Sequence, residues 1–290
     1  MFRTAVAAIL TGCLLAGCSA TSLVYDNLPW LLRQRIDARL DLTSTQSSLL
    51  KTHIAEFAAW HRREELPRYA MALERLEQAI GDGLTGAELE EFTALFKEAR
   101  RRLLSRAVPL SAEFLLTVTS AQITKFEQTH REAMDEDGER LELSPEEQAE
   151  VRYARTLDNL EDWFGDFDKT QSERIRQLLD ALPDTYPSWL QRREYRHRRI
   201  VELLQNHPTR AQLEDSLRRW WLSDTADLPP QMRTDREVFW RSANTFMLEV
   251  DGLITEQQRL HATRKLRGYR EDFVRLSKAV PVAPRANSRS

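Results

Sequence analysis

One short signal, the capping box that starts a helix, occurs eight times in this chain. In a capping box, a Ser, Thr or Asp side chain and a Glu or Gln three residues later each satisfy a free backbone N–H. Several of these pairs directly follow a chain break, such as Gly81–Gly83 or Asn206–Pro208. The eight pairs are Thr43/Gln46, Thr85/Glu88, Thr119/Gln122, Ser144/Glu147, Asp168/Gln171, Thr209/Gln212, Thr234/Glu237 and Thr255/Gln258.

Between these signals, apolar residues recur at spacings of three and four, as in Leu50, Ile54 and Phe57. Such a spacing is typical of amphipathic helices. Glycine is scarce, with nine in 290 residues, and no stretch alternates with the period of a strand. We therefore predict an all-α fold, a multi-helix bundle of about nine to ten helices. The predicted spans are 28–40, 43–80, 85–107, 109–142, 145–166, 168–181, 187–206, 209–222, 233–251 and 255–278.

Two prolines, Pro67 and Pro109, fall inside these helical patterns. Because proline lacks an N–H and its ring clashes with the preceding turn, we expect both to kink or break their helices. The segment Ser223–Gln231 contains two adjacent prolines and is the longest internal loop that we predict.

The N-terminus has the features of a bacterial signal sequence. Arg3 precedes an apolar run at 5–16, which is too short for a permanent membrane span. The run ends in Leu15-Ala16-Gly17-Cys18, which resembles the lipobox of bacterial lipoproteins. The resemblance implies cleavage before Cys18, removal of residues 1–17, and acylation of the Cys18 thiol. Cys13 would be lost with the signal.

The residue after the lipidated cysteine bears on sorting. An Asp directly after the lipidated cysteine would resemble a signal for retention in the inner membrane, but Ser19 occupies that position. We therefore expect the lipoprotein to lie on the periplasmic face of the outer membrane. We predict a tether at 18–27, a helical body at 28–278 and a disordered tail at 279–290. Within the body, a subdivision near 135–145 or 183–187 is possible.

Charge and motifs restrict the function. The chain has 42 basic and 45 acidic side chains, a net charge of −3, which argues against a general nucleic-acid binder. No second apolar run is long enough to span a bilayer, so Cys18 would carry all membrane attachment. Nucleotide-binding, P-loop, nucleophile-elbow and zinc-site patterns do not occur, and we expect no cofactor and no enzymatic activity.

Two resemblances follow from particular blocks. Leu42-Thr43-x-x-Gln46, followed by the segment from Trp60 to Tyr69, resembles the signature of an uncharacterised family of proteobacterial all-helical lipoproteins. That family has no assigned activity, so the resemblance implies a helical lipoprotein and no catalytic residue. Leu42-Thr43-x-x-Gln46, with Ile254-Thr255-x-x-Gln258, is also similar to the LTxxQ motif of periplasmic chaperones, although the motif is itself a capping box.

The unusual order of the second block makes it the candidate binding patch. It offers flat aromatic area and guanidinium charge for an envelope protein or an anionic lipid. The alternative is a kinked helix whose aromatic residues pack inward while Arg/Glu pairs cover the outside. The patch comprises Trp60, His61, Arg62, Arg63, Glu64, Glu65, Arg68 and Tyr69.

Two Glu-x-x-His pairs, Glu127/His130 and Glu194/His197, have the spacing used in di-iron helical bundles. With glutamate this common, we favour structural or surface roles for them over a metal site. The run from Arg192 to Arg199 is the most basic and could meet anionic head groups, although a solvated helix face is the simpler interpretation.

These observations leave the biochemical activity open. We expect a non-enzymatic, lipid-anchored protein that binds protein or envelope components. The alternatives are a chaperone-like protein and a metal-binding helical protein or enzyme.

Overall fold

The structure is a computed structural model that describes residues 19–223 and 227–279, with side chains described from Tyr25 onward. All of its regular elements are helices, as predicted. If α3, η1 and α4, which follow one another without a break, are counted as one, the described residues contain ten long helices. They are α2 (Ser19–Leu40), α3 (Ser44–Trp60), the π-helix η1 (His61–Glu65), α4 (Leu66–Asp82), α5 (Gly86–Leu115), α6 (Ser120–Gly138), the short 3₁₀ turn η2 (Glu139–Glu142), α7 (Pro145–Phe164), α8 (Lys169–Asp180), α9 (Tyr186–Gln205), α10 (Arg210–Leu222), α11 (Pro230–Asp251) and α12 (Glu256–Lys278).

Seven of the eight predicted capping boxes are confirmed, with both reciprocal bonds formed at each helix start. The box at Thr234 and Glu237 is wrong. Helix α11 starts earlier, at Pro230, with Pro229 as its N-cap. Proline is favourable at that position because its missing N–H would have no partner in the first turn. Thr234 therefore lies inside the helix, and its hydroxyl donates to the Pro230 carbonyl at 3.3 Å.

The two internal prolines behave differently. Before Pro67 the helix widens into η1, where the Leu66 N–H bonds the His61 carbonyl five residues back. The wider turn makes room for the proline ring. The predicted break at Pro109 is wrong, because α5 continues through it to Leu115. Burial of Val108 and Ala112 against α10, both with 0% exposure, outweighs the lost hydrogen bond.

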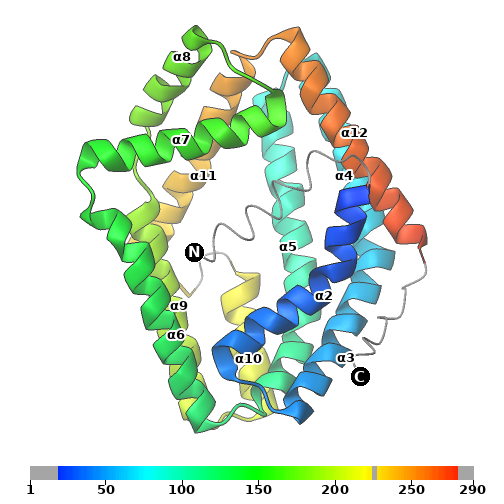
Figure 1. Cartoon of the computed structure of the whole chain (residues 1–290), viewed down its shortest axis with the longest axis vertical. Coiled ribbons are helices and arrows are strands. Elements are labelled where there is room, and N and C mark those ends of the chain that lie inside the picture. Colours follow the sequence, from blue (N-terminus) through cyan, green and yellow to red (C-terminus); the bar gives the residue numbers. More distant parts are fainter. Residues whose placement is uncertain (1–18, 224–226, 280–290) are drawn as a thin grey trace, which may run out of the picture.

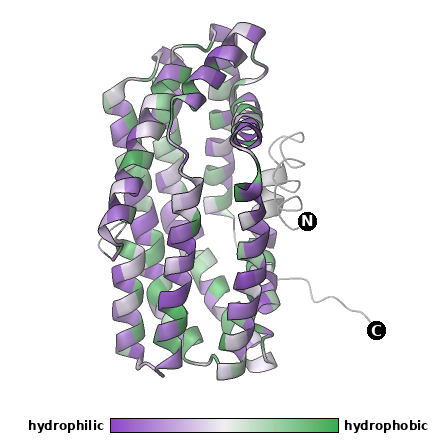
Figure 2. Ribbon diagram, turned by 90° about the vertical axis from the view of Figure 1, so that its left-hand side faces the viewer, coloured by the Kyte–Doolittle hydropathy of each residue, from purple (hydrophilic) through white to green (hydrophobic). Residues whose placement is uncertain are grey.

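The long helices run along the long axis of the molecule (Figure 1). Helices α6 and α9 form one side, α2 to α5 with α12 form the other, and α7 with α8 lies across the top. Seen from the side, each long helix carries both hydrophilic and hydrophobic residues along its length (Figure 2). This is the pattern expected where each helix buries one face.

Two helix starts meet at the lower end of Figure 1, those of α3 and α6. Gln46 and Gln122 each donate from Nε2 to the other's Oε1, at 2.9 and 2.7 Å. Gln46 also donates to the Thr117 carbonyl, and Gln122 to the Asp41 carbonyl. Each Oε1 in addition accepts its own N-cap N–H. All four hydrogen-bonding positions of each buried amide are therefore used. We call this arrangement a glutamine clamp.

A second glutamine clamp joins the starts of α8 and α12 at the upper end. Gln171 and Gln258 exchange the same two amide bonds, at 2.9 and 3.3 Å. Gln171 donates to the Leu253 carbonyl and Gln258 to the Asp166 carbonyl, again two residues before the partner's N-cap. The clamps thus repeat one bonding pattern at the two ends of the molecule.

The described residues form three hydrophobic clusters. The largest lies at the upper end between α7, α8, α11 and α12 and includes the fully buried Ile175, Val250 and Ala262. A second joins α5, α6, α9 and α10, around Val108 and Leu213. The third is small and consists of Leu40, Leu50 and Phe114 near the first clamp.

The chain ends were predicted less well. Helix α2 begins at Ser19, nine residues before the predicted start, so the stretch expected to be a tether is helical. Residues 1–18, with Cys13 and Cys18, and the predicted tail from 280 onward lie outside the described residues. The two possible subdivision points lie side by side, because the Tyr186 hydroxyl donates to the Asp137 carbonyl at 2.7 Å.

Candidate functional site: a central cavity

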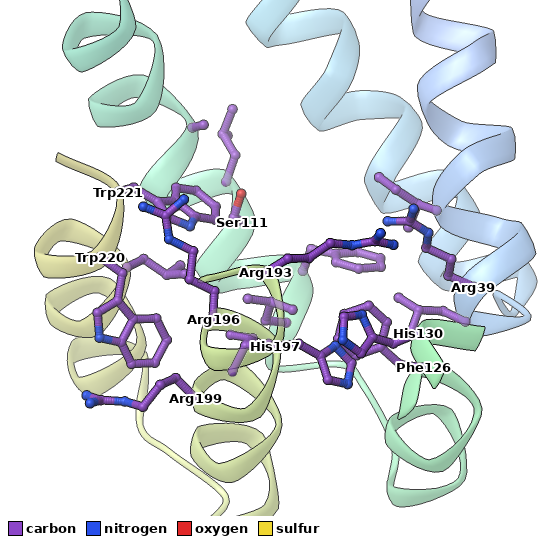
Figure 3. Close-up of a pocket in the computed structure, with 18 of the residues that line it drawn as sticks. Arg39, Ser111, Phe126, His130, Arg193, Arg196, His197, Arg199, Trp220 and Trp221 are labelled. Atoms are coloured by element: carbon purple, nitrogen blue, oxygen red, sulfur yellow. The ribbon is translucent and has the colours of Figure 1, made fainter. Parts of the chain in front are cut away.

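A cavity of about 750 Å³, partly open to solvent, lies between six helices: α2, α3, α5, α6, α9 and α10. Its volume is within the range of small-molecule binding sites. The helices on its two sides belong to different parts of the chain, and Figure 3 shows α6 and α9 facing α2, α3 and α5 across it. The cavity is therefore a product of the tertiary fold.

One wall of the cavity is apolar. Helices α2, α3 and α5 contribute aliphatic and aromatic side chains there, and Phe126 of α6 continues the surface. These positions belong to the buried face of each helix, as the three-four periodicity predicts. The apolar lining comprises Leu32, Ile36, Leu40, Leu50, Ile54, Phe57, Leu110, Phe114, Leu115 and Phe126.

The opposite wall is basic. Helix α9 presents Arg193, Arg196, His197 and Ile200 to the cavity, at the spacing of one helix face. Arg39 reaches the same region from α2, and Figure 3 shows its guanidinium directed toward that of Arg193. An ion pair with Asp137 orients Arg193. The basic run that we had interpreted as a solvated face therefore turns one side toward the cavity.

Two histidines stack between α6 and α9. The rings of His130 and His197 are parallel, with centroids 3.5 Å apart and planes inclined by 5°. His130 Nε2 lies 2.8 Å from Glu194 Oε2. Because a carboxylate only accepts, His130 Nε2 is the donor in this contact. Phe126 covers the other side of His197, with a centroid distance of 4.6 Å.

The surroundings of His197 oppose its protonation. Burial lowers its pKa first, and the positive charges of His130, Arg193 and Arg39 lower it further, while Glu194 partly offsets them. The pKa of His197 falls from its ordinary 6.5 to about 4. His197 is therefore neutral at neutral pH, and the basic groups around it make this wall electropositive.

The two Glu-x-x-His pairs meet in space, which the sequence alone left undecided. Glu127, His130, Glu194 and His197 all line a second, more polar pocket of about 600 Å³ on the far side of α6 and α9. Within the part of the chain that the structure describes, no three His, Cys, Asp or Glu side chains have the geometry of a metal site. The contacts among these residues are instead the ring stack of His130 on His197 and the hydrogen bond between His130 and Glu194.

Three residues that line the cavity carry polar atoms that are buried and have no partner among the described residues: His53 Nδ1, Trp220 Nε1 and Asp227 Oδ2. His53 is only 7% exposed. Its other nitrogen, Nε2, lies 3.7 Å from Glu113 Oε1. Because buried polar groups are nearly always paired, these atoms mark places where a ligand could form hydrogen bonds.

The candidate patch at Trp60–Tyr69 lies elsewhere, on and after η1. Glu65 is completely buried and accepts two bonds from Arg102, at 2.8 and 2.9 Å. The Tyr25 hydroxyl lies 2.8 Å from His61 Nδ1. Burial, followed by the charge of Glu65, raises the pKa of Tyr69 to about 12. These contacts join α2, η1 and α5.

The remaining members of the patch face outward to different degrees. Arg62 is paired with Asp26 of α2 at 2.9 Å. Arg63 is 72% exposed and contacts Glu64, its neighbour in the sequence. Arg68 is 48% exposed and lies 3.5 Å from Glu65. Arg63, Glu64 and Arg68 are thus the patch residues most available to a partner, and their role in binding stays a prediction.

A comparison with models of protein families assigns the chain to a family. The model of a family of unknown function (DUF6279) matches residues 38–227 of the 290. The chain belongs to this family. The matched stretch contains the whole first clamp and every residue of the cavity lining except Leu32, Ile36 and Leu228. It ends before α11 and α12, so only Gln171 of the second clamp falls inside it.

Comparison with curated proteins and with solved structures finds no match. In the described part of the chain, none of the helices is long and apolar enough to cross a membrane.

Sequence reasoning found the basic run of α9 but missed the cavity that it lines. The helix-face spacing of Arg193, Arg196 and His197 was visible. Their position opposite an apolar wall depends on long-range packing of α9 across from α2 and α3. Only the structure supplies that information.

Proposed function

We propose that this protein is a non-enzymatic binding protein of the cell envelope, which holds a molecule with an apolar part in its central cavity. The observation that carries the proposal is the cavity itself, with ten large apolar side chains along one wall. Sites of this volume and composition bury most of the surface of a small ligand. An open apolar surface of this extent is otherwise unfavourable in a water-exposed protein.

The proposed location follows from the N-terminus. We propose that Cys18 is acylated and holds the protein on the periplasmic face of the outer membrane. Two or three acyl chains bind a bilayer durably, since each buried CH₂ contributes about 0.8 kcal/mol. Trp30 and Leu28 support a position close to lipid, because both are exposed (54% and 41%) on α2, near Cys18 in the sequence. Tryptophan is favourable at such an interface.

The alternatives receive less support. In the LTxxQ-like motif, the amide of Gln46 is fully used by the first clamp, which makes the motif a structural element here. It therefore gives no argument for a chaperone. Among the Glu-x-x-His residues, His130 stacks on His197 and lies within hydrogen-bond distance of Glu194, and this arrangement gives no argument for a metal enzyme.

Ligand binding can be tested with an apolar fluorescent probe, N-phenyl-1-naphthylamine, whose emission rises in apolar surroundings. The protein is the chain from residue 18 onward with Cys18→Ser, which removes the lipid. Ser111 of α5 lines the cavity, so Ser111→Trp should fill it and abolish the fluorescence increase. Ser48→Trp, on the exposed face of α3, should leave the increase unchanged. Equal responses of the two variants would contradict the proposal.

The anchor can be tested separately in cells. Cys18→Ala should move the protein out of the outer-membrane fraction or leave it unprocessed. A Cys18→Ala protein that is cleaved by another route and still sediments with membranes in high salt would rule out the lipid anchor.

A further inference from the structure

The chemistry of the cavity wall narrows the class of ligand. We infer that the cavity takes a single-chain anionic amphiphile, with its apolar chain against α2, α3 and α5 and its carboxylate or phosphate head at the arginines of α9 and α2. This inference rests on the proposed function. The following observations support it.

The first observation is charge. Four arginines line the cavity, Arg39, Arg193, Arg196 and Arg199, against one acidic residue, Asp227. Guanidinium groups bind carboxylate and phosphate through paired, charge-assisted hydrogen bonds. Among the described residues, Arg39 has no carboxylate partner. It faces Arg193 across the cavity (Figure 3), so an anion between them would be attracted by both.

The second observation is a set of fixed orientations. The ion pair with Asp137 holds Arg193 in place. Arg199 donates to the Tyr195 hydroxyl at 3.1 Å and lies 5.2 Å from the centre of the Trp220 ring. Side chains that are already held lose less conformational freedom when a ligand binds. The basic wall is therefore partly organised for an anion.

The third observation is the unpaired polar atoms. His53 Nδ1 and Trp220 Nε1 are buried on residues that line the cavity. The Trp220 N–H can only donate. An oxygen of the ligand, such as an ester or head-group oxygen, would satisfy it. A purely aliphatic ligand would leave these groups unpaired, which costs stability.

The fourth observation is the division of the lining. The arginines of α9 follow one helix face, most of the large aliphatic side chains come from the facing helices α2, α3 and α5, and α10 adds Leu217, Trp220 and Trp221. A molecule that is apolar throughout would leave Arg39 without a counter-charge, and a small free anion would leave the apolar wall uncovered. An amphiphile matches both walls at once.

The test is displacement of N-phenyl-1-naphthylamine from the Cys18→Ser chain by four competitors. They are hexadecanoate, hexadecyl phosphate and the neutral hexadecanol, each below the concentration at which it aggregates, and inorganic phosphate. We expect the two anionic amphiphiles to displace the probe at about tenfold lower concentration than hexadecanol. Inorganic phosphate should displace nothing. Equal potency of hexadecanol and hexadecanoate, or displacement by phosphate alone, would overturn the inference.

Variants then locate the head group. Arg39→Gln should weaken hexadecanoate about tenfold and leave hexadecanol unchanged. Arg35→Gln changes an exposed arginine one turn earlier on the same helix, outside the lining; it is the matched control and should change neither. Arg196→Gln provides a second site on α9 if Arg39→Gln alters the helical circular dichroism. If neither lining variant reduces the preference for anionic ligands, the head-group site is wrong.

The two proposals fail in different ways. If the probe does not bind, or if Ser111→Trp has no effect, the proposed function fails. If the probe binds and Ser111→Trp blocks it, but charge makes no difference, only the ligand class fails.

Discussion

The two ends of the molecule use the same glutamine clamp in different surroundings. In both, two helix starts meet and two N3 glutamines satisfy each other's amide groups. The Gln171–Gln258 clamp lies beside the largest hydrophobic cluster, where Ile175, Val250 and Ala262 have no exposed surface. The Gln46–Gln122 clamp lies beside the small cluster of Leu40, Leu50 and Phe114, all of which line the cavity. We call these the packed end and the cavity end.

The difference shows that fixing the helix ends does not determine how the space between them is filled. A clamp sets where two helices start and how close they lie, but bulky side chains must still fill the interior. At the packed end they do so. At the cavity end they line an opening instead, and the family match contains the clamp at this end and all but three of the residues that line the opening.

The largest expected difference is in the cost to stability of removing a core side chain at each end. Ile175→Ala should lower the free energy of unfolding by about 3 to 4 kcal/mol, because it leaves a void in a closed core. Ile54→Ala, which lines the cavity, should cost only about 1 kcal/mol, since solvent or ligand already reaches it. Urea unfolding followed by circular dichroism measures both. Equal costs at the two sites would mean that the cavity is closed in solution.

The next effect tests whether the clamps are equivalent. Gln258→Leu and Gln46→Leu should each cost about 2 to 3 kcal/mol, because each leaves buried amide and carbonyl groups unpaired. The double change Gln171→Leu with Gln258→Leu should cost clearly less than the sum of the single changes. Strict additivity within a pair would show that the two glutamines do not interact.

The helix starts were predictable because a capping box is a local signal. Gln46, Gln122, Gln171 and Gln258 were all identified as N3 residues from the sequence. Their pairing was not, since it joins residues 76 and 87 positions apart. One clue was available: solvent-exposed boxes such as that of Ser144 use Glu, whereas a clamp needs the amide donors of Gln. Gln212, exposed and outside any clamp, shows that this clue is incomplete.

The pH dependence should come mainly from the cavity end. His197 has a pKa of about 4 in the folded protein, against an ordinary 6.5, so the unfolded chain binds more protons between these values. Stability should therefore fall as the pH drops from about 6.5 to 4. Because His197 is only half-buried, solvent screening reduces the effect to about 1 to 2 kcal/mol.

Thermal unfolding at pH 7 and pH 4.5 measures this effect. His197→Phe should reduce the loss of stability at low pH, while His207→Asn is the control. His207 is exposed and has a positive φ of 48°, which asparagine tolerates well. An unchanged pH dependence in His197→Phe would assign the effect to other groups.

The smallest expected effect is the loss of stability when an N-cap that belongs to no glutamine clamp is removed. Ser144→Ala should cost about 1 kcal/mol, because the Glu147 N–H loses its acceptor. If Ser144→Ala costs as much as Gln46→Leu, the clamp contributes nothing beyond ordinary capping. Denaturant midpoints of the two variants decide this.

The site was less predictable than the fold. The order of residues in the Trp60–Tyr69 segment made it the candidate patch, yet its most buried member, Glu65, joins η1 to α5 through Arg102. Arg39 and Ser111 carry no motif and became candidates only through the cavity. Periodicity shows which face of a helix is apolar, but it does not show which face lies opposite.

The early start of α2 has a mechanical consequence. Helix α2 runs from Ser19 to Leu40, about 33 Å at 1.5 Å per residue, with Pro29 inside it. In the sequence it begins one residue after the proposed lipid anchor; it lines the cavity through Leu32 and Ile36 and is followed by Asp41, whose carbonyl accepts a hydrogen bond from Gln122. With that anchor in place, a pull on it, or a tilt of the body on the membrane, would be transmitted along this helix to the cavity wall.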